Sequence, residues 1–546
     1  MPFRALLGLA LLIFPCIAHG QDYLSEMQSL AVSTRATNWA HWGPNHRTYS
    51  SWLSHSNRLI PLYSFGMNLD SVTGANSVYR DENKIKDLYS ALPAETLNPS
   101  AIYCDQTDVY RLQEMAAKAG KKCIVLFVFD GMDWHTTRAA AIYKSQRLYS
   151  EGRGTGLHFQ DYRGTTTDYG YFVAAPHSAD TKVNVNAQKI TGQGPIPGGY
   201  AARLAGDTPW AVPADPLYWI GKGQIRHAYP DSSATATAMT TGRKTYNEAI
   251  NVDPFGRPLS TIAHDLQQQK YAIGVVTSVP ISHATPACAY ARNVSRDDYQ
   301  DLTRDLLGLP SIYHPTQALP GVDVLLGAGF GISNEKDGDQ GENFVPGNRY
   351  LTEADLKKCD AQFGGKYQVA LRTKGQSGAD VLTAGATQAI ANGTRFLGYF
   401  GGPNGHLPFQ TADGGYDPVR GMKDKDTVDK PEIYSPADVS ENPNLAQMAV
   451  AALDVLKSRS DKMWLMIEAG DVDWANHQNN LDASIGAVLS GDAAFKATTD
   501  WIEKHVGWEN AVVLLTADHG HYLVLDDPTA LVAPKVEAAR GSTAAK

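Results

Sequence analysis

Apolar and polar positions along the chain follow a repeating order of amphipathic helix and buried strand. Residues 123 to 129, Cys-Ile-Val-Leu-Phe-Val-Phe, form an uninterrupted apolar run, which is typical of a strand buried on both faces. Apolar residues at helical spacing precede it from residue 107 to Gly120. We expect the same order at 260–269 with 272–277 and at 445–456 with 463–467, and a last strand at 511–516. This alternation predicts an α/β fold, with a doubly wound, mostly parallel central sheet and helices on both faces.

The remaining stretches are less periodic. Residues 21–107 contain no motif that carries chemistry, and we interpret them as an N-terminal extension of unknown role. We expect residues 108–546 to form the catalytic domain. Within that domain, the Gly/Pro/Asp-rich tracts 136–226 and 308–440 are predicted to be large loop insertions at the mouth of a site.

The first twenty residues predict export. Arg4, an apolar run from Leu6 to Ile17 and a small-residue end before Gln21 are typical of a cleaved signal peptide, and the run is too short to span a bilayer. We therefore expect a periplasmic or extracellular protein without an integral membrane anchor. A net charge of −9 argues against nucleic acid as a partner. Disulfide pairing among Cys104, Cys123, Cys288 and Cys359 is left open, because an exported protein can pair cysteines, but the surroundings of Cys123 and Cys288 also suit buried thiols.

The stretch from Asp231 to Gly242 places a hydroxyl beside an acid at the expected start of a helix. Its small residues, Ser-Ser-Ala-Thr-Ala-Thr-Ala-Met-Thr-Thr, wind into a helix without crowding a site. The first turn of such a helix aims free backbone N–H groups at an anion. Ser232 is the candidate nucleophile, although a Ser/Thr-rich turn that merely caps a helix has the same local sequence.

Acidic residues follow three of the expected strands: Asp130, Glu468 and Asp518. The carboxyl ends of parallel strands share one edge of the sheet, where open α/β sheets bind ligands. Asp473 and His477 are four residues apart, so a short helix places both on one face, and a histidine directly follows Asp518. Gathering these charges without cations is costly, so we expect the site to bind metal ions.

Taken together, these pieces resemble the alkaline phosphatase family. The resemblance extends over about residues 123–521 and leaves the stretch before residue 108 without a counterpart. The matching pieces are Asp130-Gly-Met, Asp231-Ser232 with Ala-Thr-Ala and Thr-Thr-Gly, Lys244-Thr-Tyr-Asn247, His283-Ala-Thr285-Pro-Ala, Arg296, Glu468 to His477, and Thr516-Ala-Asp518-His519-Gly-His521.

The resemblance implies a site with three metal ions that hydrolyses small phosphate monoesters through a phosphoserine at Ser232. Arg296 would bind two phosphate oxygens with its planar fork. His521 would orient a carboxylate ligand. The family is commonly dimeric, so a homodimer is a further expectation, for which we find no interface signal. The implied ligands are Asp130, Asp518, His519 and the Ser232 oxygen for one Zn²⁺, Asp473, His477 and a further histidine for a second Zn²⁺, and Asp130, Thr285 and Glu468 for Mg²⁺.

The sequence departs from the family pattern at the second zinc. The family usually supplies the last histidine ligand well downstream of the position matched by His521, and here no histidine follows before Lys546. We therefore expect an incomplete zinc site and a truncated C-terminus, with His406 as an alternative ligand. His283 and Trp474 stand where members of the family vary near the magnesium. His283 is interpreted as a direct ligand, a water-mediated neighbour or a packing residue.

Two other functions are kept beside the monoesterase. One is a related hydrolase that prefers diesters, sulfates or phosphonates, as relatives in the wider superfamily do. The other is a non-catalytic protein that binds phosphate and metal, because the last zinc ligand is missing. The monoesterase is favoured by Arg296, Thr285 and Glu468, because they resemble the residues with which the family binds a doubly charged terminal phosphate.

Overall fold

A ten-stranded sheet organises the protein. The computed structural model describes residues 23–56, 59–173, 177–201, 229–423 and 428–533, and the predicted signal peptide and the C-terminal tail fall outside them. The order of the strands is β12-β13-β9-β8-β14-β4-β15-β2-β5-β3. In that order their bounds are Tyr367–Leu371, Arg395–Tyr399, Val324–Ala328, Ala272–Pro280, Met463–Ala469, Cys123–Phe129, Ala511–Thr516, Ile60–Phe65, Thr167–Val173 and Cys104–Asp105.

All but one of these strands run in the same direction. The ladders from β12 through β15 are parallel, and β3 is parallel to β5. Only β2 runs the other way, antiparallel to both β15 and β5. The central strands β4, β14, β8 and β15 are buried along their whole length, which explains their uninterrupted apolar sequences. The predicted α/β fold with a mostly parallel sheet is confirmed.

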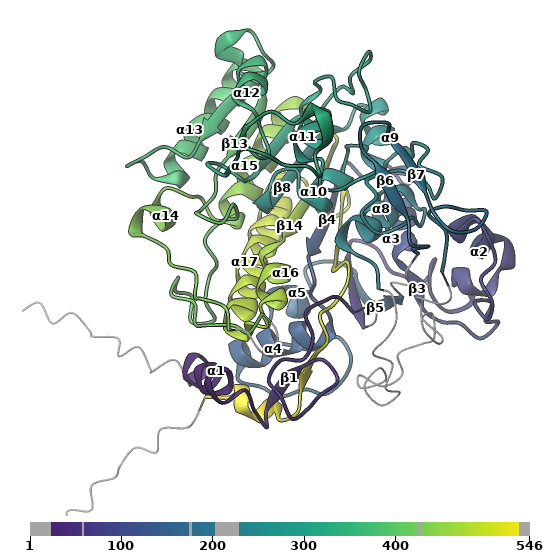
Figure 1. Ribbon diagram of the computed structural model, residues 1–546, viewed down its shortest axis with the longest axis vertical. Coiled ribbons are helices and arrows are strands. Elements are labelled where there is room, and N and C mark those ends of the chain that lie inside the picture. Colours follow the sequence, from purple (N-terminus) through teal and green to yellow (C-terminus); the bar gives the residue numbers. More distant parts are fainter. Residues whose placement is uncertain (1–22, 57–58, 174–176, 202–228, 424–427, 534–546) are drawn as a thin grey trace, which may run out of the picture.

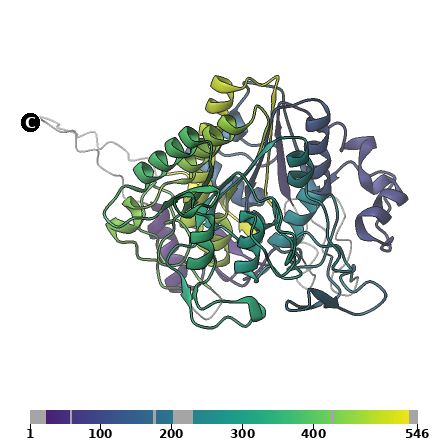
Figure 2. The same ribbon diagram turned by 90° about the horizontal axis from the view of Figure 1, so that it is seen from above.

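Helices cover both faces of the sheet (Figure 2). One face carries α13 (Gly378–Asn392), α15 (Leu445–Arg459) and α17 (Leu481–His505), with α1 (Tyr23–Thr34), α4 (Trp134–Ser145) and α5 (His158–Asp161) packed against α17. The other carries α3 (Gln106–Lys118), α8 (Ser232–Thr241), α9 (Ile262–Gln268), α10 (Ala284–Cys288) and α11 (Tyr299–Leu307). The other α-helices within the described residues are α2 (Glu82–Tyr89), α12 (Glu353–Cys359), α14 (Pro436–Ser440) and α16 (Asp471–His477).

The segment 21–107, interpreted from the sequence as an N-terminal extension of unknown role, contributes strands to this fold. It supplies β2 to the middle of one half of the sheet and β3 to one edge. It also supplies β1 (Ala40–Trp42), which pairs antiparallel with β16 (Leu523–Leu525). Figure 1 shows this purple N-terminal strand beside the yellow C-terminal part of the chain. The two ends of the described region therefore meet in space.

The tracts predicted to be insertions also contribute to the sheet. Residues 308–440 contain β9, β12 and β13, which form one end of the sheet, and residues 136–226 contain β5 near the other. The strands β9, β12 and β13 are only five residues long and lie between turns rich in Gly and Pro. They therefore lack the long uninterrupted apolar run that marks a central strand in the sequence. The tracts also hold the short hairpins of β6 (Lys182–Asn184) with β7 (Lys189–Thr191) and of β10 (Ser333–Asn334) with β11 (Gly347–Asn348).

Two further features bear on the sequence predictions. Cys104, Cys123, Cys288 and Cys359 are all buried free thiols, which agrees with the interpretation of the surroundings of Cys123 and Cys288. Within the residues that the structure describes, no helix combines the length and the apolar character needed to cross a bilayer.

Candidate active site

Ser232 is the first residue of α8, as the sequence predicted. Asp231 caps this helix, because its carboxylate accepts a hydrogen bond from the Ala234 backbone N–H at 2.9 Å. Every residue of α8 is buried, and its small side chains let it pack closely against α3 and α10. The Ser232 hydroxyl points to the carboxyl edge of the sheet, where its oxygen lies 3.1 Å from His519 Nε2 and 3.3 Å from Asp130 Oδ1.

Asp130, Asp518 and His519 form a first cluster of metal-ligating residues around this hydroxyl. Asp130 follows β4 and Asp518 follows β15, so two neighbouring parallel strands deliver them to one edge. His519 Nε2 lies 3.3 Å from Asp130 Oδ1 and 3.4 Å from Asp518 Oδ2. Burial, with the nearby charge of Asp518, raises the pKa of Asp130 well above its usual range. Buried carboxylates that are this difficult to ionise side by side are typical of a site where a bound cation balances their charge.

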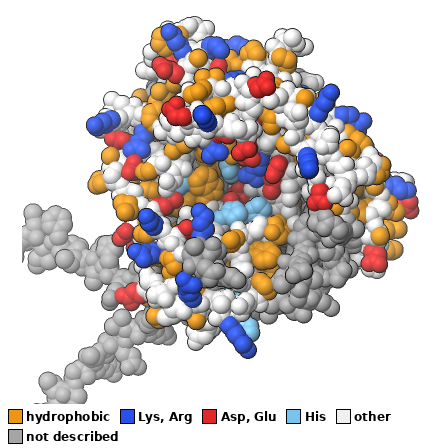
Figure 3. Space-filling model, viewed as in Figure 1, with side chains coloured by type: hydrophobic (Ala, Val, Ile, Leu, Met, Phe, Trp, Pro, Cys, Tyr) orange, Lys and Arg blue, Asp and Glu red, His pale blue; other side chains and the backbone are white. Residues whose placement is uncertain are grey.

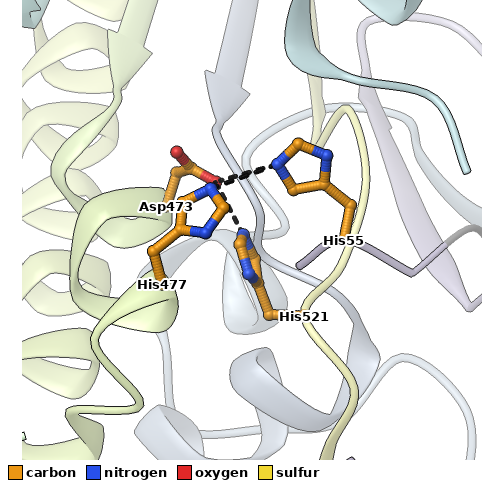
Figure 4. Close-up of side chains that lie close together, drawn as sticks. All are labelled: His55, Asp473, His477 and His521. Carbon is orange, nitrogen blue, oxygen red and sulfur yellow. Dashed lines mark hydrogen bonds and ion pairs between the residues drawn. The ribbon is translucent and has the colours of Figure 1, made fainter. Parts of the chain in front are cut away.

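Asp473, His477, His521 and His55 form a second cluster (Figure 4). The short helix α16 presents Asp473 and His477 on one face, with Asp473 Oδ1 3.5 Å from His477 Nε2. His521 Nε2 lies 2.6 Å from the same oxygen, and His55 Nε2 lies 3.9 Å from it. Burial raises the pKa of Asp473, but His477 and His521 together lower it to well below the usual range. Asp473 is therefore an ionised carboxylate surrounded by imidazoles.

Glu468 and Thr285 supply oxygen atoms beside the first cluster. Glu468 is the sixth residue of β14 and accepts a hydrogen bond from the Thr277 hydroxyl on the adjacent strand β8. Burial raises the pKa of Glu468 to about 8, against the effect of that hydrogen bond, which lowers it.

Four buried oxygen atoms in this region have no hydrogen-bond partner within the described part of the chain: Asp130 Oδ2, Thr285 Oγ1, Glu468 Oε1 and Asp518 Oδ2. Buried polar atoms are normally paired, and each unpaired one has a cost. Hard oxygen donors of this kind suit Mg²⁺, whereas combinations of imidazole and carboxylate, as in both clusters, suit Zn²⁺. The residues therefore fit the cations that the family resemblance implies.

Arg296 is held at the entrance to Ser232 by the acid that caps α8. Its guanidinium Nη1 lies 3.0 Å from Asp231 Oδ2, and Nη2 lies 3.4 Å from His283 Nε2. Burial lowers the pKa of Arg296, but Asp231, Tyr299 and Asp297 together raise it by more, so the net shift is upward and the guanidinium stays charged. Burial, followed by Arg296, lowers the pKa of His283 to about 3. His283 is thus neutral and packs edge-on against Trp474, with ring centroids 5.7 Å apart.

These residues surround one open cavity of about 310 Å³. Figure 3 shows pale-blue histidine side chains at the floor of a hollow near the centre of the molecular face. A phosphate group at this floor would touch the Ser232 hydroxyl, the Arg296 guanidinium and residues of the second cluster. The cavity is lined by Ser232, Arg296, His283, Trp474, Asp473, His477, His55, Lys423 and Gln478.

His406 lies outside both clusters, so the alternative in which it completes the second zinc site gains no support. Its Nδ1 is 2.5 Å from the Leu407 carbonyl and its Nε2 is 3.1 Å from Glu432, so both ring nitrogens are engaged. The ring stacks on Phe409 at 4.0 Å and meets Trp474 edge-on at 4.9 Å. His406 therefore supports the wall of the cavity.

His55 is the site residue that the sequence analysis missed. It stands in a Ser- and Asn-rich stretch without periodicity, and a lone histidine there has no local signal. The one available clue was the apolar run that follows at residues 60–65. Such a run indicates a buried strand, and the loop before a buried strand starts at an edge of the sheet.

Comparisons with known proteins find relatives among phosphatases. The sequence model of the alkaline phosphatase family matches residues 222–530. Alkaline phosphatase 4 of Bacillus subtilis is 28% identical over 289 residues, which cover 53% of this chain and 49% of that protein. Streptomycin-6-phosphate phosphatase of Streptomyces griseus is 28% identical over 345 residues, covering 59% of this chain and 68% of that protein. The chain thus spans about half the length of the Bacillus relative.

Solved structures show a corresponding likeness. The cold-active alkaline phosphatase of a Shewanella species has a TM-score of 0.43 at 21% identity, covering 73% of this chain and 68% of that one. The alkaline phosphatase of Thermus thermophilus has a TM-score of 0.44 at 20% identity, covering 73% of this chain and 60% of that one. Since the family model covers more than half of the sequence, the protein belongs to the alkaline phosphatase family.

Proposed function

We propose that the protein hydrolyses phosphate monoesters through a phosphoserine intermediate at Ser232. The observation that carries this proposal is the position of the Ser232 oxygen, 3.1 Å from His519 and 3.3 Å from Asp130, at the floor of a cavity that Arg296 also lines. A buried serine at a helix N-terminus, beside the Arg296 guanidinium and two clusters of metal-ligating residues, suits attack on the phosphorus of an anionic phosphate ester. Membership of the family supports the same reaction.

Three cations are part of the proposal. Asp130, Asp518, His519 and Ser232 would hold one Zn²⁺, Asp473 and His477 would contribute to a second, and Asp130, Thr285 and Glu468 would hold Mg²⁺. When bound, such cations act as Lewis acids and lower the pKa of coordinated water and hydroxyl groups.

The residues of the chain then have distinct roles. Arg296 binds two oxygens of the phosphate dianion through its planar fork, and Asp231 keeps the guanidinium in position. The Ser232 oxygen attacks phosphorus, and the bond from phosphorus to the alcohol oxygen breaks, which leaves phosphate on the serine and releases the alcohol. Water from the open cavity then attacks phosphorus, and the serine hydroxyl is restored as inorganic phosphate leaves.

The cellular address is also part of the proposal. The apolar run from Leu6 to Ile17 supports export, and a periplasmic or extracellular location brings the enzyme to phosphate esters outside the cytoplasm. Small phosphate esters are accordingly the proposed substrates.

The test is hydrolysis of p-nitrophenyl phosphate at alkaline pH with Zn²⁺ and Mg²⁺ supplied, by the wild type and two serine variants. Ser232→Ala should lose turnover. Ser233→Ala is the matched control, because Ser233 is an equally buried neighbour whose hydroxyl bonds Asp231 at 2.8 Å, and it should keep turnover. Acid quenching followed by mass spectrometry should find phosphate on Ser232 alone. Turnover by Ser232→Ala, or a higher kcat/KM for bis(p-nitrophenyl) phosphate, would overturn the proposal.

A further inference from the structure

The loop that precedes β2 reaches the second cluster through a backbone pairing with the loop that follows β15. Ser56 and Gly520 form an antiparallel bridge, in which the Ser56 N–H donates to the Gly520 carbonyl at 2.6 Å and the reverse bond is 3.0 Å. This pairing places the His55 ring on the His519 ring, with centroids 3.8 Å apart and planes 26° apart. An N-terminal residue is thereby fixed at the floor of the cavity.

The tautomer of His477 follows from its contact with the same loop. Its Nδ1 lies 2.9 Å from the Leu53 carbonyl oxygen, which can only accept a hydrogen bond. Nδ1 must therefore carry the proton, and the neutral ring has its lone pair on Nε2. Ligating histidines almost always donate their other ring N–H to a carbonyl or carboxylate in this way. The Nε2 lone pair faces His55 Nε2 at 3.2 Å (Figure 4).

The role of His521 is different. Its Nε2 lies 2.6 Å from Asp473 Oδ1, which is the geometry of a ring N–H that donates to a ligating carboxylate and holds it in place. It therefore has no lone pair to offer a cation beside Asp473. Its side chain is only 1% exposed, whereas those of His55 and His477 are 13% and 39% exposed and line the cavity.

We propose that His55, Asp473 and His477 form a three-residue zinc site, in which the Leu53 carbonyl orients His477 and His521 orients Asp473. Two imidazoles and one carboxylate are a ligand set found in catalytic zinc sites, which keep a fourth position for water or substrate. Here that position faces the cavity. His55 takes the place of the downstream histidine that the family resemblance led us to expect. This inference rests on the proposed function in one respect, because the zinc site and the phosphate ester would share the same cavity.

The test measures metal binding rather than turnover. Metal-free protein is titrated with Zn²⁺, and the zinc that remains after gel filtration is counted by mass spectrometry. His55→Ala should lose one zinc per chain, and the affinity of that site should fall by at least about 100-fold, the upper end of the loss for an orienting residue. His521→Ala should weaken the same site by about 10- to 100-fold and regain full occupancy at saturating zinc. His46→Ala, an exposed histidine of the same segment, and His406→Gln should retain wild-type zinc content.

A cysteine variant identifies the ligand directly. The thiolate of His55→Cys should restore the lost zinc, because cysteine also binds zinc. Loaded with Co²⁺, this variant should show a sulfur-to-cobalt charge-transfer band in the near ultraviolet that the wild type lacks. The four cysteines that the structure describes are buried free thiols, and none belongs to either cluster. Circular dichroism of the metal-free variants checks that each is folded.

Full zinc content and affinity in His55→Ala, or a cobalt-loaded His55→Cys without the charge-transfer band, would overturn the assignment. Phosphomonoesterase turnover is assayed separately on the wild type. A wild type that shows the His55-dependent zinc but no turnover would overturn the proposed function and leave the zinc site standing.

Discussion

Replacing Arg296 with lysine tests whether the guanidinium fork, rather than its charge alone, binds the phosphate. In the wild type one nitrogen of the fork is 3.0 Å from Asp231, and the side chain is 15% exposed, so its position is set before substrate arrives. Lysine keeps the positive charge but offers a single flexible ammonium. Arg296→Lys should therefore lose one hydrogen bond to the phosphate together with the tether to Asp231.

The size of the loss follows from the kind of bond. A hydrogen bond to a charged group contributes about 1.5–3 kcal/mol, which corresponds to a roughly 10- to 150-fold fall in kcat/KM. The phosphate carries its charge in the ground state as well as in the transition state. Much of the loss should therefore appear as a higher KM, and inhibition by inorganic phosphate should weaken in parallel.

The assay compares kcat, KM and phosphate inhibition for the wild type, Arg296→Lys and a control, Arg257→Lys. The control changes an exposed arginine that also pairs with an aspartate, Asp253, at 2.6 Å, but lies outside the residues that line the cavity. It should behave as the wild type does. If Arg296→Lys keeps wild-type kcat/KM and wild-type phosphate inhibition, the fork does not bind phosphate and the assignment of Arg296 is wrong.

Two further predictions concern stability. Lys244→Ala should lower the free energy of unfolding by about 3–5 kcal/mol in denaturant, because it leaves the buried Asp105, 2.8 Å away, without its charge partner. The exposed ion pair of Lys86 is the control, and Lys86→Ala should cost at most about 1 kcal/mol. In chelator-treated protein burial raises the folded-state pKa of Glu468 from its ordinary value of 4.5 to about 8. The protonated carboxyl therefore contributes its full stability below about pH 4.5, and this contribution is lost as the pH rises to about 8. Thermal unfolding of metal-free protein should therefore show a fall in stability over this window that Glu468→Gln reduces, and added Mg²⁺ should raise the melting temperature more at pH 8 than at pH 6. A loss from Lys244→Ala no larger than the control, or a pH profile that Glu468→Gln leaves unchanged, would contradict the respective argument.

The parts of the site that sequence predicts are those that local patterns encode. The strands that deliver Asp130, Glu468 and Asp518 are fully buried, so their apolar runs are unbroken and their ends are visible. Neighbouring parallel strands necessarily bring their carboxyl ends together, so the convergence of these acids follows from the fold class. The spacing of Asp473 and His477 is likewise local, because α16 is a single short helix.

The parts that sequence does not predict depend on pairings between distant residues. The Thr516 hydroxyl donates to the Pro61 carbonyl at 2.7 Å across 455 positions of sequence, and this contact belongs to the β2–β15 ladder. No periodicity in a window of ten or twenty residues carries such information, and the local composition of residues 21–107 suggested only a polar extension. The short strands at the sheet ends were missed for the same reason, since their partners lie outside their own segment.

The direction of one strand decides how His55 reaches the site. The ligands lie at the carboxyl edge of the parallel strands, so a parallel strand sends the residues that follow it to that edge and the residues that precede it to the opposite one. A residue in the loop directly before a strand therefore reaches the site only when that strand runs in the opposite direction. β2 is the strand of the central sheet that runs against its neighbours, and Leu53 and His55 lie a few residues before its first residue, Ile60. The single antiparallel strand next to β15 is thus what allows the N-terminal part of the chain to supply a ligand that the family pattern places near the other end.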